Sequence, residues 1–167
     1  MKRTSRISGT TALVAAALLC GGTAVAAGPA PTAGLVDGVI VVAGNTCTWT
    51  NGRTSANPPS ALTVDRTSIN RPGGNLACGG GITASLNNNP AFTFDDAAGT
   101  ARTDLIDITG QQSFISCRYK ATNITWNREG TSRKYVNQAF TATKSSGSFL
   151  CPGSVSTPAG GATMLFH

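Results

Sequence analysis

The sequence contains little charge and almost no histidine. Of its 167 residues 12% are charged, and the single histidine, His167, is the last residue. A serine or cysteine hydrolase of the triad type needs a base within reach of its nucleophile, and chain ends are commonly poorly ordered. We therefore expect no nucleophilic triad and no enzyme of that kind.

Closely spaced cysteines are also missing. After Cys20, the remaining four cysteines are separated by 31, 39 and 34 residues, and no C-x-x-C pair occurs. Structural zinc sites use short Cys or His spacings around a tetrahedral ion. The sequence therefore predicts no metal site and no cofactor.

Long hydrophobic runs are absent except near the N-terminus. Three basic residues among the first six precede an apolar run at Ala12–Leu19, and small residues lead to Ala26. This order predicts a cleavable signal peptide at 1–26, with cleavage after Ala26 or Ala27. A lipid anchor at Cys20 is the minor alternative, because a leucine precedes that cysteine. We expect a secreted protein, extracellular or cell-wall associated, with no integral membrane span.

The charge balance of the expected mature chain is slightly positive. Of 13 Lys and Arg, 3 lie in the expected signal peptide, so 10 oppose 7 Asp and Glu, giving 10 − 7 = +3. Arg128, Arg133 and Lys134 are close in sequence, but Glu129 interrupts them and no basic run with interleaved aromatics occurs. Nucleic acid is therefore not an expected partner.

An even number of cysteines in an exported chain predicts disulfides. Cys47, Cys78, Cys117 and Cys151 allow three pairings. An internal echo favours one of them, because segment 74–83 resembles segment 147–156 around its cysteine, and an aromatic residue follows each upstream cysteine by two positions. We expect Cys47–Cys78 and Cys117–Cys151 in two similar halves, 46–86 and 116–156. Each bridge should contribute about 3–4 kcal/mol through the unfolded chain.

Alternation with a period of two runs through the expected mature chain. Between Leu76 and Leu86 every second residue is apolar or small, and further alternating runs surround Phe92, Ile106 and Cys117. Turn residues rich in Gly, Asn, Asp and Pro separate these runs. The pattern predicts an all-β protein, an antiparallel β-sandwich or flattened barrel of roughly 7–10 short strands stapled by the two disulfides.

The expected mature chain has room for one domain. Residues 27–35 are rich in Gly, Pro and Ala and predict a flexible N-terminus, and 36–167 predict a single β-sandwich domain. Near Thr122 and Asn123 the apolar positions change parity, which predicts a bulge or a strand that crosses between sheets. No helix of three turns is expected, and the pattern does not fix the strand order.

The acidic residues offer the only candidates for acid and base chemistry. A glycosidase needs two opposed carboxyl groups, for which Asp95, Asp96, Asp104, Asp107 and Glu129 are available. Adjacent residues of a strand point to opposite faces, and a Gly-containing segment follows Asp95 and Asp96, so a turn is the favoured interpretation. Two adjacent acids without further ligands also give little support to a Ca²⁺ site.

The large aromatic residues offer a candidate binding surface. Trp49 and Tyr119 share strand parity with their neighbouring cysteines, so we expect them to cover the disulfides in the core. Trp126 and Tyr135 flank an expected hairpin and, with Arg128, are the candidate residues for a surface that stacks on a sugar or an apolar ligand.

Several short motifs carry a resemblance to a known family. They are Thr125-Trp126-Asn127, Thr131-Ser132, Asn137, Cys151 with Gly153, and Leu76-Ala77-Cys78 with its Gly-rich continuation. Within Leu76–Ser156 the chain resembles exported proteins known as activators of alkane oxidation, and overall it resembles small secreted proteins of high-GC Gram-positive bacteria. The resemblance implies an extracellular β-sandwich accessory protein that touches hydrophobic substrates or other envelope components, and it carries over no catalytic residues.

Three classes of function follow from these features. The favoured hypothesis is a non-catalytic envelope or extracellular protein that acts by surface binding or adhesion, with self-assembly through exposed strand edges as a variant. The second is a module that binds carbohydrate or apolar compounds, and the third is a small glycoside hydrolase using Asp95, Asp96 or Glu129. The corresponding partners are cell-wall polysaccharide, apolar compounds or other envelope proteins.

Overall fold

The computed structural model describes residues 32–42, 44–70 and 76–167. The expected signal peptide at 1–26 lies outside the described residues. Most of the segment 27–35, expected to be flexible, lies outside them too. Its last two residues, Gly34 and Leu35, already belong to the first strand, so order begins earlier than the sequence predicts. The described part of the domain lies within one compact unit, Pro31–His167.

Twelve strands and one short helix make up the described chain. The strands are β1 Gly34–Val42, β2 Asn45–Thr54, β3 Leu62–Thr63, β4 Ala77–Cys78, β5 Thr83–Leu86, β6 Ala91–Asp95, β7 Thr100–Gln112, β8 Ile115–Arg128, β9 Lys134–Asn137, β10 Phe140–Gly147, β11 Ser154–Thr157 and β12 Ala162–Phe166. The helix α1, Arg66–Ile69, is a single turn, and the Asp65 carboxylate caps it by accepting a hydrogen bond from the Thr67 backbone N–H at 2.9 Å.

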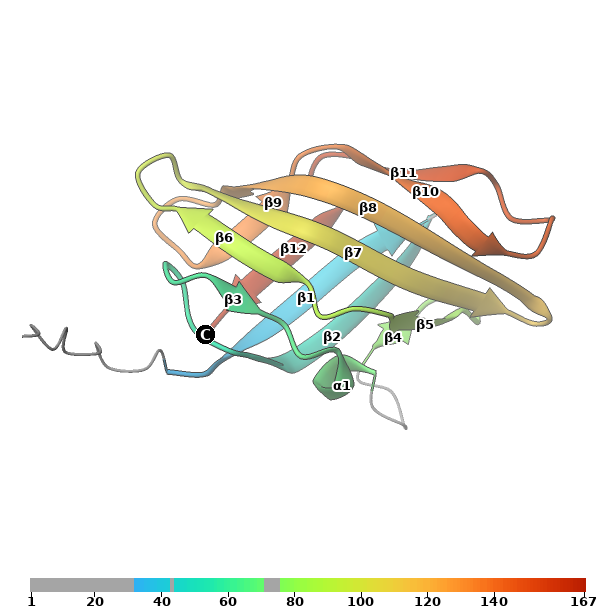
Figure 1. Ribbon diagram of the computed structural model, residues 1–167, viewed down its shortest axis with the longest axis horizontal. Helices are drawn as coiled ribbons and strands as arrows, with labels where there is room; N and C mark the ends of the chain where they lie inside the picture. Colours follow the sequence, from blue (N-terminus) through green and yellow to red (C-terminus); the bar gives the residue numbers. More distant parts are fainter. Residues whose placement is uncertain (1–31, 43, 71–75) are drawn as a thin grey trace, which may run out of the picture. The chain divides into compact units, whose positions relative to one another are not determined.

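The strands form one antiparallel sheet that closes on itself (Figure 1). Eight strands make the closed ring in the order β8, β9, β12, β1, β2, β4, β5 and β7, and the β7–β8 pairing completes it. Each of the two long strands pairs with two further strands along the edge that faces away from the β7–β8 pairing. β7 pairs with β6 near its start and β5 near its end, while β8 pairs with β10 near its start and β9 near its end. β11 extends the sheet beyond β10, and β3 extends it beyond β6.

This architecture confirms the coarse prediction and corrects its details. The described part of the chain is antiparallel and mostly β, with two disulfides. The sheet is a closed barrel with outer strands, so it is not a sandwich of two separate sheets. The predicted 7–10 short strands are too few, partly because the alternating run Leu76–Leu86 is two strands, β4 and β5, which pair antiparallel on either side of residues 79–82. β7 and β8 are long instead, with 13 and 14 residues.

The change of parity near residue 123 is confirmed. Tyr119 and Ala121 are buried before it, and Ile124 and Trp126 are buried after it. Asn123 has a left-handed backbone (φ 55°), a conformation that asparagine adopts more readily than most residues. The register of β7 on β8 is the same on both sides of this point. The positions that face the core therefore shift by one residue at the same point in β7 and β8, without a bulge.

The two disulfides have the predicted pairing. Cys47 bonds to Cys78 and Cys117 bonds to Cys151. The surroundings of the bridges differ, because Cys47 and Cys78 lie opposite each other on β2 and β4, whereas Cys151 lies in the connection between β10 and β11. The segments 46–86 and 116–156 also contain different elements in a different order. The similarity of segments 74–83 and 147–156 therefore indicates the two disulfides, but the two halves do not share a fold.

Five aromatic rings fill one end of the barrel. Phe92, Phe94, Trp126, Tyr135 and Phe166 pack with ring centroids 5.2–6.3 Å apart, mostly edge to face or tilted. Such pairs add to the free energy of burial. The indole N–H of Trp126 donates to Oγ1 of buried Thr103 at 2.8 Å, so the polar atom of this ring is satisfied. We call these five residues the aromatic cluster.

Trp49 packs further along the barrel, in a space that a glycine provides. Gly38 of β1 pairs with Trp49 of β2, and a Cβ at residue 38 would overlap the Trp49 ring. Both Trp49 and Tyr119 are buried, each with 6% of its surface exposed, as the sequence predicts. Residue 38 is therefore limited to glycine by the volume of the neighbouring indole.

Replacing Gly38 with Ala should destabilise the fold. The added methyl must displace a buried ring in a closely packed core, which typically lowers the free energy of unfolding by about 1–3 kcal/mol. Urea unfolding monitored by circular dichroism measures this change. Gly110→Ala is the matched control on β7, because a Cβ there meets nothing within 4 Å. Equal stability of the Gly38→Ala and Gly110→Ala proteins would contradict the packing described.

Candidate functional site

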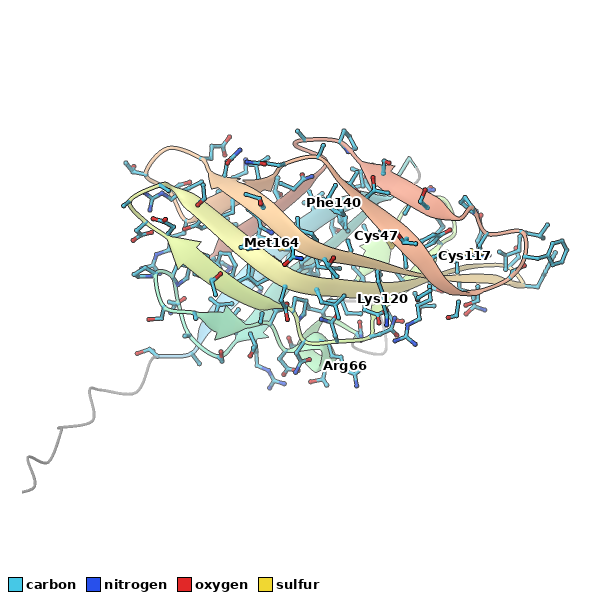
Figure 2. The ribbon with its side chains drawn as sticks, turned by 45° about the horizontal axis from the view of Figure 1, so that its top comes forward. Cys47, Arg66, Cys117, Lys120, Phe140 and Met164 are labelled. Carbon is cyan, nitrogen blue, oxygen red and sulfur yellow. A yellow bond between two sulfur atoms is a disulfide. The ribbon has the colours of Figure 1, made fainter. Side chains whose placement is uncertain are left out.

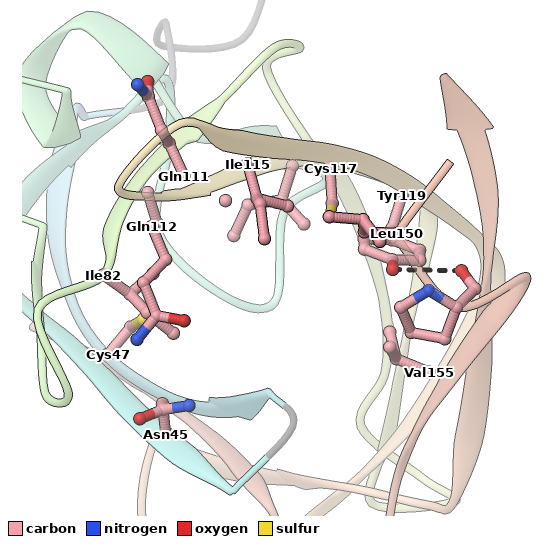
Figure 3. A pocket seen from close by; sticks show the side chains of 14 residues that line it. Asn45, Cys47, Ile82, Gln111, Gln112, Ile115, Cys117, Tyr119, Leu150 and Val155 are labelled. Atoms are coloured by element: carbon pink, nitrogen blue, oxygen red, sulfur yellow. Dashed lines mark hydrogen bonds between the residues drawn. The ribbon is translucent and has the colours of Figure 1, made fainter. Parts of the chain in front are cut away.

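The other end of the barrel contains a cavity of about 360 Å³. It lies where the start of β2, the β7–β8 hairpin and the β10–β11 connection meet (Figure 3). Cys47 and Cys117 both line it, and both lie toward this end of the barrel in Figure 2. The described lining residues are Asn45, Cys47, Ile82, Ala84, Ile108, Gly110, Gln111, Gln112, Ile115, Cys117, Tyr119, Leu150, Pro152 and Val155.

Small residues on two adjacent strands leave this space open. Ala84 of β5 pairs directly with Gly110 of β7, and both line the cavity. A Cβ built on Gly110 meets no atom within 4 Å. Rings fill the barrel at the level of the aromatic cluster, whereas here the inward positions of two adjacent strands carry at most one methyl group. Ile108, two residues before Gly110, forms the boundary with the filled core.

The walls of the cavity are apolar. Ile82, Ile115 and Val155 contribute aliphatic side chains, and the two disulfide-bonded cysteines on the wall add sulfur (Figure 3). Binding of an apolar ligand to such walls is favourable, because apolar surface removed from water contributes about 25 cal/mol per Å². Its size falls within the range of small-molecule sites, roughly 300–1,000 Å³.

The polar groups of the lining are neutral amides and one phenol. Asn45 and Gln112 lie on one side of the cavity, whereas the Gln111 side chain points away from it (Figure 3). The Gln112 side chain donates to the Gly80 carbonyl at 2.8 Å. None of the described lining residues is charged. The site can therefore offer hydrogen bonds to a neutral polar group, but no countercharge for a buried ion.

Tyr119 joins the cavity wall to the loop that covers it. Its hydroxyl donates to the Pro152 carbonyl at 3.1 Å (Figure 3), and burial raises the pKa of the phenol. Tyr119 therefore stays neutral at physiological pH and holds the β10–β11 connection against β8. It does not act as a base here, because a phenol with a raised pKa keeps its proton.

The β10–β11 connection is held at several further points. The Cys117–Cys151 bridge joins it to β8, and the Ser148 backbone N–H donates to the Ser116 carbonyl at 2.9 Å. The Lys144 ammonium group donates to the carbonyls of Ser148 and Cys151 at 3.3 and 3.4 Å. One wall of the cavity is thus a loop fixed by covalent and hydrogen bonds.

The predicted surface of Trp126 and Tyr135 is wrong. Trp126 is 0% exposed and Tyr135 is 2% exposed, because both rings belong to the aromatic cluster. Arg128 lies on the surface nearby, where its guanidinium contacts the Asp96 carboxylate at 2.9 Å. The three residues therefore do not form an exposed stacking surface. Trp126 shares strand parity with buried Ile124, and this signal pointed inward.

The candidate acidic residues serve turns and surface ion pairs. Asp95 accepts a hydrogen bond from the Ala98 backbone at 2.9 Å, Asp96 pairs with Arg128, and Glu129 pairs with Lys134 at 2.7 Å. The favoured interpretation of Asp95 and Asp96 as a turn is confirmed. Among the described residues, no group of three or more His, Cys, Asp or Glu side chains is arranged to hold a metal ion.

Sequence reasoning did not identify the cavity residues as a site. Ile82 and Ile115 stand out only as members of alternating runs, which indicates burial and not whether the space beside them is filled. Leu150 and Val155 carry no distinctive motif. A signal existed in the pairing of two small residues, Ala84 and Gly110, but it becomes visible only when the strand order is known.

Comparison with protein-family models, curated proteins and solved structures finds no match to this chain. In the described part of the chain, no helix is long and apolar enough to cross a membrane.

Outside the cavity wall, β7 and β8 are joined by a buried carboxylate. Asp107 has 5% of its side chain exposed and receives two hydrogen bonds from Arg118, at 2.8 and 2.7 Å. The Asn87 side chain donates to it at 2.9 Å, and Lys120 lies 3.7 Å away. The hydrogen bonds from Arg118 lower the pKa of Asp107, against the opposing effect of burial. Arg118 follows Cys117 directly, so this ion pair supports the strand that carries the second bridge.

Replacing Asp107 with Asn should lower stability at neutral pH by about 1–3 kcal/mol, because it leaves donors unpaired. A carboxylate whose folded pKa is lowered stabilises the fold above its unfolded pKa. This contribution is lost as pH falls through the folded pKa. As the pH falls below the ordinary pKa of Asp, the free energy of unfolding of the wild type should therefore decrease more steeply than that of Asp107→Asn. Urea titrations from neutral pH into this range measure both effects.

Lys120→Gln is the control, because this exposed partner at 3.7 Å should contribute only a few tenths of a kcal/mol. Parallel pH profiles for the wild-type and Asp107→Asn proteins would show that the carboxylate does not stabilise the fold.

Proposed function

We propose that this chain is a secreted, non-catalytic protein that binds an uncharged apolar ligand in the cavity at the disulfide-bonded end of its barrel. The observation that carries the proposal is a cavity of about 360 Å³ with aliphatic and sulfur walls and only neutral polar groups. Liquid water occupies about 30 Å³ per molecule, so roughly a dozen groups of that size fit. A medium-length alkyl chain has this volume.

The apolar class is favoured over carbohydrate by the position of the rings. Sugar sites need exposed aromatic faces with hydrogen-bonding groups around them, and the aromatic cluster is buried. The resemblance to exported activators of alkane oxidation points to the same ligand class. Among the described residues, the acidic side chains proposed for a glycosidase hold turns or surface ion pairs, so hydrolysis is the less favoured function.

Secretion is part of the proposal. The two disulfides need an oxidising compartment to form and persist, and the pattern at 1–26 is that of an export signal. A binding protein outside the cell could hold apolar compounds that dissolve poorly in water. Adhesion and self-assembly stay as alternatives that the cavity itself does not favour.

Decanol should displace a neutral hydrophobic fluorophore, N-phenyl-1-naphthylamine, from the protein with a Kd of roughly micromolar order. Burial of a methylene group contributes about 0.8 kcal/mol, and several are needed to exceed the costs of association. Maltotriose should not displace the probe. Displacement by the sugar and not by the alcohol would favour the carbohydrate alternative.

Gly110→Leu should block the site, because the new side chain extends into open space from the cavity wall. We expect decanol affinity to fall at least tenfold, while circular dichroism shows an unchanged fold. Gly110→Ala is the graded control and should have a smaller effect. Unchanged decanol binding by folded Gly110→Leu protein would rule out this cavity as the binding site.

A further inference from the structure

The most exposed large apolar side chains gather at the mouth of the cavity. Phe114, at the tip of the β7–β8 hairpin, is 87% exposed, and Phe149 and Leu150, in the β10–β11 connection, are 89% and 53% exposed. We call these three residues the apolar rim. Leu165 of β12, 42% exposed, is the other large hydrophobic residue of this kind among the described ones. Exposure of several large apolar side chains at one place marks an interaction surface.

The two tips of the rim lie side by side. Gly147, just before the β10–β11 connection, pairs with Cys117 of β8, and the next backbone N–H, from Ser148, donates to the Ser116 carbonyl at 2.9 Å. The Cys117–Cys151 bridge closes the base of the same loop. The rim is therefore held in place with its side chains in water, and docking would cost little ordering entropy.

The net charge behind the rim is positive. The described residues of the connections at this end, 44, 79–82, 113–114 and 148–153, include no acidic side chain. Lys144 lies at the base of the loop that carries Phe149, and Arg118 and Lys120 follow on the outer face of β8 around the single carboxylate of Asp107. The turns at the opposite end are different, since they carry acidic residues such as Asp96 and Glu129.

The size of the rim argues against a second protein surface. Large aromatic side chains bury roughly 150–250 Å² each, so three rim residues provide less than the roughly 800 Å² per partner of a standard protein interface. A lipid surface needs no complementary shape. Apolar tips that enter it, with cations one layer behind them, match the arrangement of interfacial anchors on anionic membranes.

We infer that the apolar rim docks this protein onto an anionic lipid bilayer surface, with the cavity mouth facing the lipid. Phe114 and Phe149 enter the interface, and the net positive charge of Lys144, Lys120 and the Arg118–Asp107 pair attracts the headgroups. A ligand then passes between bilayer and cavity without crossing water. The docking itself does not require the cavity to be filled, so it stands apart from the proposed ligand binding.

Sedimentation with vesicles tests the docking. The full mature chain should bind vesicles of equal parts phosphatidylglycerol and phosphatidylcholine about tenfold more tightly than vesicles of phosphatidylcholine alone, and added salt should weaken the binding. The double variant Phe114→Ser and Phe149→Ser should bind the mixed vesicles at least tenfold more weakly, because two rings no longer enter the interface. Leu165→Ser, the matched exposed apolar change on β12, should bind as the wild type does.

A reporter on the rim gives a second measurement. The two native tryptophans, Trp49 and Trp126, are buried, so Phe149→Trp adds an exposed indole whose emission should shift to the blue with mixed vesicles. The double serine variant should keep its affinity for decanol, and Gly110→Leu should keep its affinity for vesicles. Absence of wild-type binding to the mixed vesicles, or equal binding by the double serine variant, would overturn the inference.

Discussion

Side chains fill one end of the barrel and leave the other end open, and the candidate site depends on this difference. Five rings occupy one end, where Trp126 is completely buried and its indole N–H is satisfied by Thr103. At the other end, Ala84 and Gly110 lie side by side on neighbouring strands of the wall, and the space in front of them stays open. Because protein interiors are otherwise closely packed, a cavity of this size at an open barrel end is the feature that most distinguishes the molecule. The candidate function follows from it.

The disulfides compensate for the core that the hollow end lacks. Few buried side chains hold the two-residue strand β4, and Cys47–Cys78 joins it covalently to β2. Cys117–Cys151 does the same for the β10–β11 connection, which Tyr119 also supports through Pro152. Cross-links stabilise chiefly by restricting the unfolded chain, so they can hold the walls without occupying the cavity. A hollow end can thus persist without collapsing.

The sequence predicts much of the fold and little of the site. Alternating runs and the turn at Asp95–Asp96 indicate antiparallel strands, and the cysteine echo indicates the correct bridges. The run Leu76–Leu86, which alternates like a single strand, is instead two strands, β4 and β5, that fold back on each other. Closure into a barrel depends on the β7–β8 pairing and on the two-residue strand β4, which local patterns do not encode. The burial of Tyr135 and the space beside Gly110 depend on what lies across the barrel. Periodicity reports which face a residue takes, but not the volume opposite it.

Methyl-resolved NMR with decanol tests most directly whether the hollow end is a binding site. The methyl signals of Ile82, Ile115 and Val155, which line the cavity, should shift in a saturable way as decanol is added. The methyl signals of Ile124, buried in the second half of β8 near the aromatic cluster, should stay in place. Saturable shifts confined to Ile124 and its neighbours, or no shifts at any of these methyl groups, would contradict the account.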